Sequence, residues 1–245
     1  MTTTKNTLQV MILDTETNGL PKTWGDYSDI NMLELGWVVC DIDLNVVKEG
    51  NYLVKGNFDV PEIITKLTGI TKEKTDLEGK PLDYVLKEFH EDLKKCEFIV
   101  AHNLQFDFGM MKKELSTMRN PKYLNEFRSK IQLDSLWMFR QIFKKPTIVN
   151  HRLTTIYDHL HPNENFIQTH RALDDVKMII SCMNRIDNFN LMNFYWNKPM
   201  NFGKYRGKKM TYHQVLQKDN YYYKNSIMRK FHKINPFKLK HFLKR

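Results

Sequence analysis

The hydrophobic positions of the chain form dense runs in its first sixty residues and take on helical spacing after them. Residues 8–13 are an almost unbroken apolar run, which is typical of a central strand buried on both faces. Two further runs, at 32–39 and 46–54, predict strands joined by a hairpin turn at 43–45. Two more short strands are predicted at 98–101 and 131–133.

Helical spacing is clearest in residues 82–93, where apolar side chains recur every three or four positions and share one face. The pattern also predicts helices at 106–115, 135–143, 153–160 and about 172–183. Three strands followed by alternating helices and strands predict an α/β layered fold with a mixed sheet.

The apolar periodicity weakens between residues 186 and 199, where Asn, Phe and Tyr become frequent. We therefore predict a main domain over residues 1–190 and a small module over 197–245. The chain has 245 residues, 41% of them hydrophobic, which is enough for a sizeable core. It has no run of 18 apolar residues, so no transmembrane helix is expected.

The net charge of +10 is concentrated in the C-terminal module. Residues 197–245 hold 14 Lys and Arg and one acid, Asp219, which gives +13; the other 24 basic and 27 acidic residues give −3. Such an excess predicts a polyanionic partner for the module. Nucleic acid is the expected partner, an anionic membrane is the competing interpretation, and a solvated tail without a partner is the third.

The cysteines and the N-terminus bear on the compartment. Cys40, Cys96 and Cys182 are odd in number and far apart, so we expect reduced thiols packed as small hydrophobic groups and not zinc ligands. Residues 1–9 contain one Lys and no apolar segment, so no secretory signal is expected. These features predict an intracellular protein, in the cytoplasm or nucleus.

Acidic residues stand at the ends of predicted elements. Asp14 and Glu16 end the first strand, where alternate side chains point to one side, so their carboxylates would lie together. Asp107 lies just inside the helix that follows the fourth strand. Taken one at a time, each also fits an ordinary role in a turn or near a helix N-terminus.

The last predicted helix of the main domain carries Asp174 and Asp175. Periodicity places Asp174 on a polar face, where it would be solvated, and Asp175 on a largely apolar stripe, where an unpaired carboxylate is costly. Asp175 therefore needs a partner, for which a metal ion is suitable. For His170 to serve the same site, it must lie on the loop before this helix.

Together these segments resemble the three exonuclease motifs of the DEDD superfamily, in its His-containing, DnaQ-like branch. That branch includes the proofreading epsilon subunit of bacterial DNA polymerase III, exonuclease X and oligoribonuclease. The matching segments are LDTETNGLP at 13–21, AHNLQFD at 101–107 and HRALDD at 170–175. LTGIT at 67–71 resembles a further family segment, with Thr68 in place of the usual His. The resemblance spans about residues 8 to 184.

The resemblance implies a ribonuclease-H-like fold with a five-stranded mixed sheet flanked by helices. It implies 3′→5′ exonuclease activity that releases nucleoside 5′-monophosphates. His170 would be the general base. Two divalent cations, Mg²⁺ or Mn²⁺, would be held by four acidic residues: Asp14, Glu16, Asp107 and Asp175.

The same resemblance implies substrate contacts by Thr17, Leu20 and Asn103. Leu20 would pack against the terminal base, and Asn103 would support the active-site loop. Core packing of Leu20 and a helix-capping bond by Asn103 are the structural alternatives.

The segment FGKYRGKK at 202–209 resembles a short C-terminal module of some exonuclease X proteins. Lys204, Tyr205 and Arg206 are predicted to bind substrate, because bases stack on aromatic rings while cations follow the phosphates. The alternative is that the tyrosines of the module form a small core. Residues 233–245 are predicted to be a basic helix or arm.

The leading hypothesis is an active exonuclease that acts on the 3′ end of DNA or RNA, expected to be single-stranded. The alternatives are an inactive nucleic-acid-binding module of the same fold and a protein that binds membranes or partners through its basic tail. All five site residues are present, which counts against a retired site. The chain contains no polymerase segment, so we expect any proofreading to need a separate partner, and the identity of a polymerase or repair partner stays open.

Overall fold

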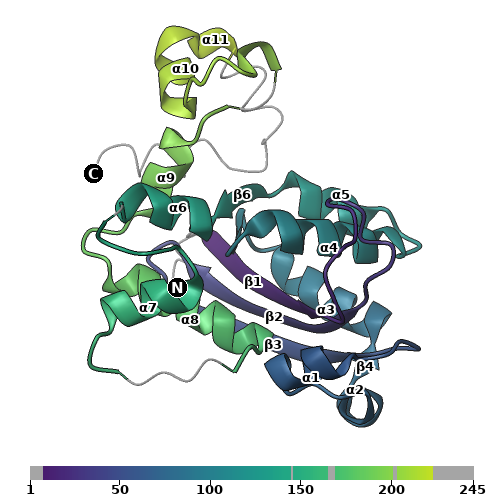
Figure 1. Ribbon diagram of the computed structural model, residues 1–245. Helices are drawn as coiled ribbons and strands as arrows, with labels where there is room; N and C mark the ends of the chain where they lie inside the picture. The colour runs from purple at the N-terminus through teal and green to yellow at the C-terminus, as the bar shows by residue number, and fades with distance from the viewer. Residues whose placement is uncertain (1–7, 145, 165–168, 201–202, 223–245) are drawn as a thin grey trace, which may run out of the picture.

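The computed structural model describes residues 8–144, 146–164, 169–200 and 203–222, which are built around one sheet (Figure 1). The strand order is β4-β3-β2-β1-β5-β6. β1 pairs antiparallel with β2 and parallel with β5, so the first strand is central and the sheet is mixed. The strands are β1 (Gln9–Thr17), β2 (Met32–Asp41), β3 (Val46–Lys55), β4 (Lys80–Pro81), β5 (Phe98–Ala101) and β6 (Ile131–Asp134).

All five predicted strands are present, and the turn at 43–45 is confirmed. Asp41 stabilises this turn, because its Oδ1 accepts hydrogen bonds from the backbone N–H of Asp43 and of Asn45. The expected count of five strands is wrong by one. β4 adds a two-residue strand that pairs with the end of β3, and both of its residues are exposed, so no apolar pattern marks it.

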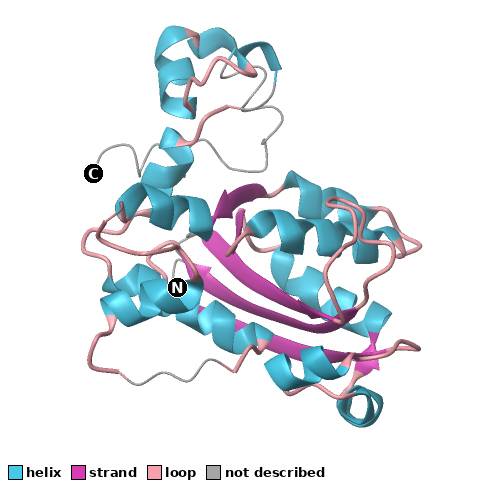
Figure 2. Ribbon diagram, in the orientation of Figure 1, coloured by secondary structure: helices cyan, strands magenta, loops and turns pink. Residues whose placement is uncertain are grey.

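Helices cover both faces of the sheet (Figure 2). α6 (Ser135–Ile142), α7 (Leu153–Leu160) and α8 (Ala172–Arg185) pack on one face. α3 (Leu82–Leu93), α4 (Leu104–Ser116) and α5 (Lys122–Ser129) pack on the other. β1 contributes Val10 and Ile12 to the first layer and Met11 and Leu13 to the second, which confirms that it is buried on both faces.

The predicted helices at 82–93 and 153–160 coincide with α3 and α7. The other three correspond to α4, α6 and α8, with ends that differ by one or two residues. The sequence pattern does not predict the shorter helices α1 (Glu62–Thr68), α2 (Lys72–Glu78), α5, α9 (Leu191–Asn197), η1 (Gly203–Tyr205), α10 (Tyr212–Lys218) and α11 (Asn220–Tyr222). Within the described ranges, no helix has the length and apolar character that crossing a membrane requires.

α9 lies across the predicted boundary between the main domain and the C-terminal module. Asn190 caps it by accepting hydrogen bonds from the backbone N–H of Met192 and Asn193. Its apolar side chains join the core layer formed by α6, α7 and α8, and this layer continues into Tyr205, Tyr212 and Val215. α10 and α11 stand beyond α9 (Figure 1). The division of the chain at residues 190–197 stays a prediction.

Candidate active site

Three carboxylates converge where β1 ends and α8 begins. As predicted, Asp14 and Glu16 present their side chains together, and Asp175 joins them from the first turn of α8. One carboxylate oxygen from each of the three lies within 4.8 Å of the other two. Hard oxygen ligands at this spacing suit Mg²⁺ or Mn²⁺, so the donor set fits the divalent cations expected from the sequence.

Asp107 lies beside this group and not within it. Its side chain is only 2% exposed, and its Oδ1 accepts hydrogen bonds from the backbone N–H of Thr15 at 3.0 Å and from the Thr15 hydroxyl at 2.8 Å. The fourth predicted ligand is therefore held next to β1 by a residue that lies between two of the others. Its role as a metal ligand stays a prediction.

The electrostatics of the site favour a bound cation. Burial raises the pKa of Asp14 well above its ordinary value, and the charges of Asp107 and Glu16 raise it further. Burial, followed by the charge of Asp175, raises the pKa of Glu16 to about 8. Burial also raises the pKa of Asp107 to about 7. Without a cation, this cluster holds protons that exposed carboxylates release.

This arrangement gives a testable prediction for the metal-free protein: its free energy of unfolding falls as the pH rises from 6.5 to 8. The ordinary pKa of Glu16 is 4.5, so in this window the folded state keeps a proton that the unfolded state has released. Each pH unit then lowers the free energy of unfolding by up to about 1.4 kcal/mol for this group. Saturating Mg²⁺ should flatten the slope, because the cation replaces the proton. Urea denaturation in chelator and in Mg²⁺ measures both slopes.

The window starts at pH 6.5 because, below that value, two histidines make the free energy of unfolding rise with pH. Burial lowers the pKa of His90 and His102 from 6.5. Glu16→Gln is the matched control, and it should make the slope shallower without removing it, because Asp14 and Asp107 also hold protons in the folded state. A wild-type slope in chelator that is flat or positive would contradict the burial of an acidic cluster.

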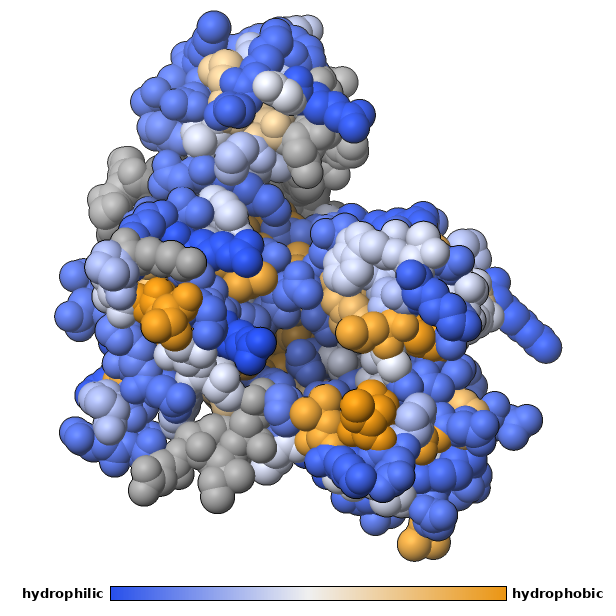
Figure 3. All heavy atoms as spheres, viewed as in Figure 1, coloured by the Kyte–Doolittle hydropathy of each residue, from blue (hydrophilic) through white to orange (hydrophobic). Residues whose placement is uncertain are grey.

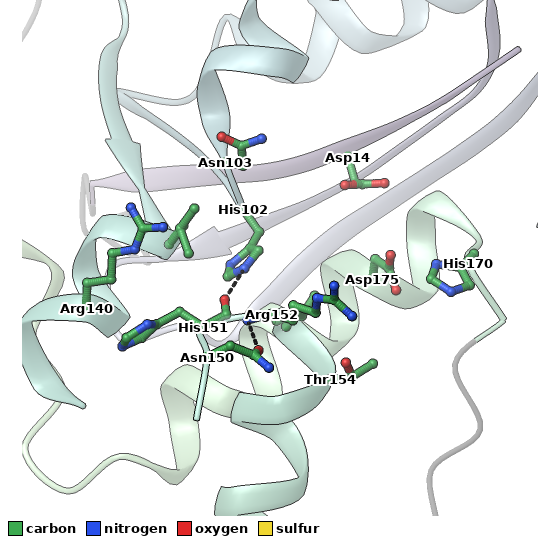
Figure 4. Close-up of a pocket in the computed structure, with 12 residues that line it drawn as sticks. Asp14, His102, Asn103, Arg140, Asn150, His151, Arg152, Thr154, His170 and Asp175 are labelled. Atoms are coloured by element: carbon green, nitrogen blue, oxygen red, sulfur yellow. Dashed lines mark hydrogen bonds between the residues drawn. The ribbon is translucent and has the colours of Figure 1, made fainter. Parts of the chain in front are cut away.

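His170 lies on the loop immediately before α8, as its proposed role requires. Its backbone takes a left-handed conformation with φ of 47°. Its side chain lines the same pocket, of about 850 Å³, as Asp14 and Asp175 (Figure 4). In the space-filling view, the face of the molecule seen in Figure 1 is hollowed at its centre, with mostly hydrophilic residues around the hollow (Figure 3).

A buried ion pair fixes the start of α8 against β2. Both oxygens of Glu34, whose side chain is fully buried, accept hydrogen bonds from the guanidinium of Arg171, and one also accepts from the backbone N–H of Ala172 at 3.1 Å. Gly36 allows this close approach, because a Cβ at this position would lie 2.5 Å from the backbone N of Leu173. The residues on either side of the pair, His170 and Asp175, are thereby held in place.

The contacts of Arg171 and Asp174 differ from those expected of a solvated helix face. Arg171 pairs with Glu34, 137 positions away, which helical periodicity cannot indicate. Asp174 is half-buried, and its Oδ2 accepts a hydrogen bond from the hydroxyl of Thr169 at 2.6 Å. The predicted solvation of Asp174 is therefore wrong in part.

The three predicted substrate contacts near the cluster have different surroundings. Thr17 is buried, and its hydroxyl donates to the carbonyl of Gly19 at 2.7 Å, which stabilises the turn before Leu20. Leu20 is 76% exposed, so the core-packing alternative is wrong. Asn103 lines the pocket in a left-handed conformation, and its side chain makes no capping bond to α4, so the capping alternative is wrong too.

In the C-terminal module, Asp219 draws two of the predicted substrate contacts together. It pairs with the ammonium of Lys204 and accepts a hydrogen bond from the hydroxyl of Tyr205 at 2.9 Å. Tyr205 is only 6% exposed and Tyr212 is equally buried, which confirms the small-core alternative for these two rings. Arg206 is exposed. Substrate binding by Lys204, Tyr205 and Arg206 stays a prediction, and residues 233–245 lie outside the described part of the chain.

The pocket also holds residues to which the sequence assigns no role. His102 bridges two elements: its Nε2 donates to the carbonyl of His151 at 3.0 Å, and its Nδ1 lies 3.0 Å from the hydroxyl of Ser135. Arg140 and Arg152 line the pocket as well. These partners are 33 to 49 positions from His102. His102 itself lies within a matched motif, which was the only signal that could have singled it out.

Comparison with known proteins identifies relatives of the main part of the chain. The exonuclease family model RNase_T matches residues 11–183. The 3′-5′ exonuclease DinG of Staphylococcus epidermidis is 25% identical over 202 residues, which are 79% of this chain and 20% of DinG. DNA polymerase III subunit epsilon of Buchnera aphidicola is 29% identical over 147 residues, which are 58% of this chain and 61% of that subunit. This chain thus spans from a fifth to three fifths of these relatives.

Among solved structures, a complex of E. coli exonuclease I with single-stranded DNA superimposes with a TM-score of 0.59 at 16% identity, over 73% of this chain and 40% of that chain. A second structure of exonuclease I gives 0.60, also at 16% identity, over 76% of this chain and 42% of that one. At such identities the likeness establishes the fold, which is ribonuclease-H-like. The match to RNase_T ends before the C-terminal module, whose resemblance to exonuclease X stays a prediction.

Proposed function

The chain belongs to the RNase T family of 3′-5′ exonucleases, and from this premise we propose that it removes nucleotides one at a time from the 3′ end of a DNA or RNA strand. The observation that carries the proposal is the convergence of Asp14, Glu16 and Asp175 within 4.8 Å. Three acids so close together at a pocket oppose folding unless cations or protons join them. Their placement is therefore better explained by function than by stability.

We assign the holding of two divalent cations to Asp14, Glu16, Asp107 and Asp175. When bound, such cations supply an activated water and neutralise charge on the phosphate and the leaving 3′-oxygen. His170 would accept the proton of the attacking water from its position on the loop before α8. The hydrolysed bond joins phosphorus to the 3′-oxygen, so the expected product is a nucleoside 5′-monophosphate.

Single-stranded substrate is the further proposal. A homologous fold, that of exonuclease I, has been solved with single-stranded DNA. The exposed Leu20 offers an apolar surface on which a terminal base can pack. The epsilon-subunit relative belongs to a polymerase, which supports a separate polymerase or repair partner for this chain.

The test uses 5′-labelled single strands of DNA and RNA with the same sequence, each incubated with Mg²⁺, with Mn²⁺ and with chelator. We expect a metal-dependent ladder that shortens from the 3′ end and identifies the preferred sugar. Asp175→Ala should abolish the ladder, whereas Asp174→Ala, which removes the same charge one position away, should keep it. Binding without any ladder would overturn the enzyme and leave an inactive nucleic-acid-binding module.

A further inference from the structure

The pocket that contains the acidic residues also has a cationic side. Arg140, near the end of α6, and Arg152, immediately before α7, line the same pocket as Asp14 and Asp175. In Figure 4, Arg140 lies toward one end of the pocket and His170 toward the other, with Arg152 between them. Opposite charges thus occupy different parts of one open cavity.

The two guanidinium groups are not used within the fold in the way that Arg171 is. Arg171 is bound to the buried Glu34, whereas Arg140 and Arg152 are exposed. In the part of the chain that the structure describes, neither Arg140 nor Arg152 forms an ion pair with a carboxylate. A guanidinium binds phosphate oxygens through two parallel hydrogen bonds, which makes Arg the preferred residue for such recognition.

The backbone that carries Arg152 is held firmly. Asn150 Oδ1 accepts hydrogen bonds from the backbone N–H of Arg152 and from the hydroxyl of Thr155, both at 2.9 Å. His151 is fixed at both ends, because its carbonyl accepts from His102 and its Nε2 donates to the carbonyl of Phe143 at 2.8 Å. The backbone of Arg152 is therefore ordered before a ligand arrives, so binding has only the side chain left to order, which lowers its entropic cost.

The chemistry of a 3′ end determines which phosphates these cations can meet. The nucleotide that is released lies on the 3′ side of the scissile phosphate and carries no further phosphate in the chain. Every other backbone phosphate lies on the 5′ side. A cation that binds a second phosphate in this pocket therefore binds the strand that remains after cleavage.

We propose that Arg140 and Arg152 form a phosphate subsite that holds the strand on the 5′ side of the scissile bond. This inference rests on the proposed exonuclease function and adds to it a site for the retained strand. It predicts that substrate length decides the importance of the two arginines. A dinucleotide with a free 5′-hydroxyl contains only the scissile phosphate, so it cannot use the subsite.

The experiment compares a twelve-nucleotide strand, (dT)₁₂ or (rU)₁₂, with the dinucleotide of the same base and sugar, using the sugar that the wild-type protein degrades. For Arg140→Gln/Arg152→Gln, KM for the long strand should rise about tenfold, the size of one charge-assisted hydrogen bond, with kcat unchanged. The slope of log KM against log salt should become shallower by about 1.4, since each single-strand phosphate contact contributes about 0.7. Hydrolysis of the dinucleotide should stay within about twofold of wild type.

The matched control is Arg119→Gln/Arg128→Gln, which removes the same charge from exposed positions that do not line the pocket. An equal effect of both double variants would show that only overall charge matters and would overturn the subsite. The subsite would also be overturned if Arg140→Gln/Arg152→Gln lost equal activity on the dinucleotide and on the long strand, or if it changed the hydrolysis of neither. If the wild-type protein degrades neither substrate, the exonuclease function itself fails, an outcome distinct from a failure of the subsite alone.

Discussion

Replacing Asp14 with Asn is expected to lower the exonuclease rate by about 10³-fold or more and, at the same time, to stabilise the metal-free protein. The rate falls because a neutral amide is a poor ligand for a catalytic cation. Stability rises because the pKa of Asp14 is raised by burial and by Asp107 and Glu16, so folding at neutral pH opposes its charge, and Asn has none. Ladder assays in Mg²⁺ and thermal melting in chelator measure the two effects.

Asp43→Asn is the control for this pair of measurements, because Asp43 is an exposed residue in the hairpin turn. It should change neither the rate nor the melting temperature. Loss of activity in Asp14→Asn together with lower stability would indicate local damage to the site and not the removal of a ligand. Wild-type activity in the variant would remove Asp14 from the mechanism.

Replacing Arg171 with Met is expected to lower the free energy of unfolding by about 3 to 5 kcal/mol, because it leaves the charge of Glu34 buried without its partner. Activity should fall too, since the pair holds the start of α8, which carries Asp175. Urea denaturation measures the loss of stability.

Lys177→Met is the matched control on the same helix. Lys177 pairs with Glu49 across side chains that are 50% and 39% exposed, so its loss should cost less than about 1 kcal/mol. Equal losses in the two variants would contradict a special role for the buried pair. A stable but inactive Arg171→Met variant would assign the pair to positioning alone.

The parts of the fold that the sequence predicts are those in which a local pattern repeats over many residues. β1 is a continuous apolar run and α3 has a clear apolar face, and both lie where expected. β4 consists of two residues, both exposed, and α1 consists of seven residues, and both lengths are too short for a periodic pattern to emerge. α9 is rich in aromatic and Asn residues, which resemble a linker until tertiary contacts bury them.

The candidate site divides in the same way. Asp14 and Glu16 alternate along one strand, so their neighbourhood can be predicted from the geometry of that strand. The pairing of Glu34 with Arg171 joins residues 137 positions apart and depends on how α8 docks on the sheet. The cationic side of the pocket likewise forms only when α6 and the segment before α7 fold against the end of β5, where His102 contacts Ser135 and His151. Such contacts belong to the tertiary structure, and no local pattern contains them.

The central position of β1 in the sheet has a consequence for how the chain folds. Val10 of β1 pairs with Phe98, the first paired residue of β5, which lies 88 positions further along the chain. Asp14 joins the acidic cluster with Asp175, which lies 161 positions downstream. Pairings between such distant segments form slowly, because closing a long loop comes before any gain from contacts. The acidic cluster is therefore completed late in folding. A partly folded chain has no such cluster, so the cation binding proposed above should appear only when the native state forms.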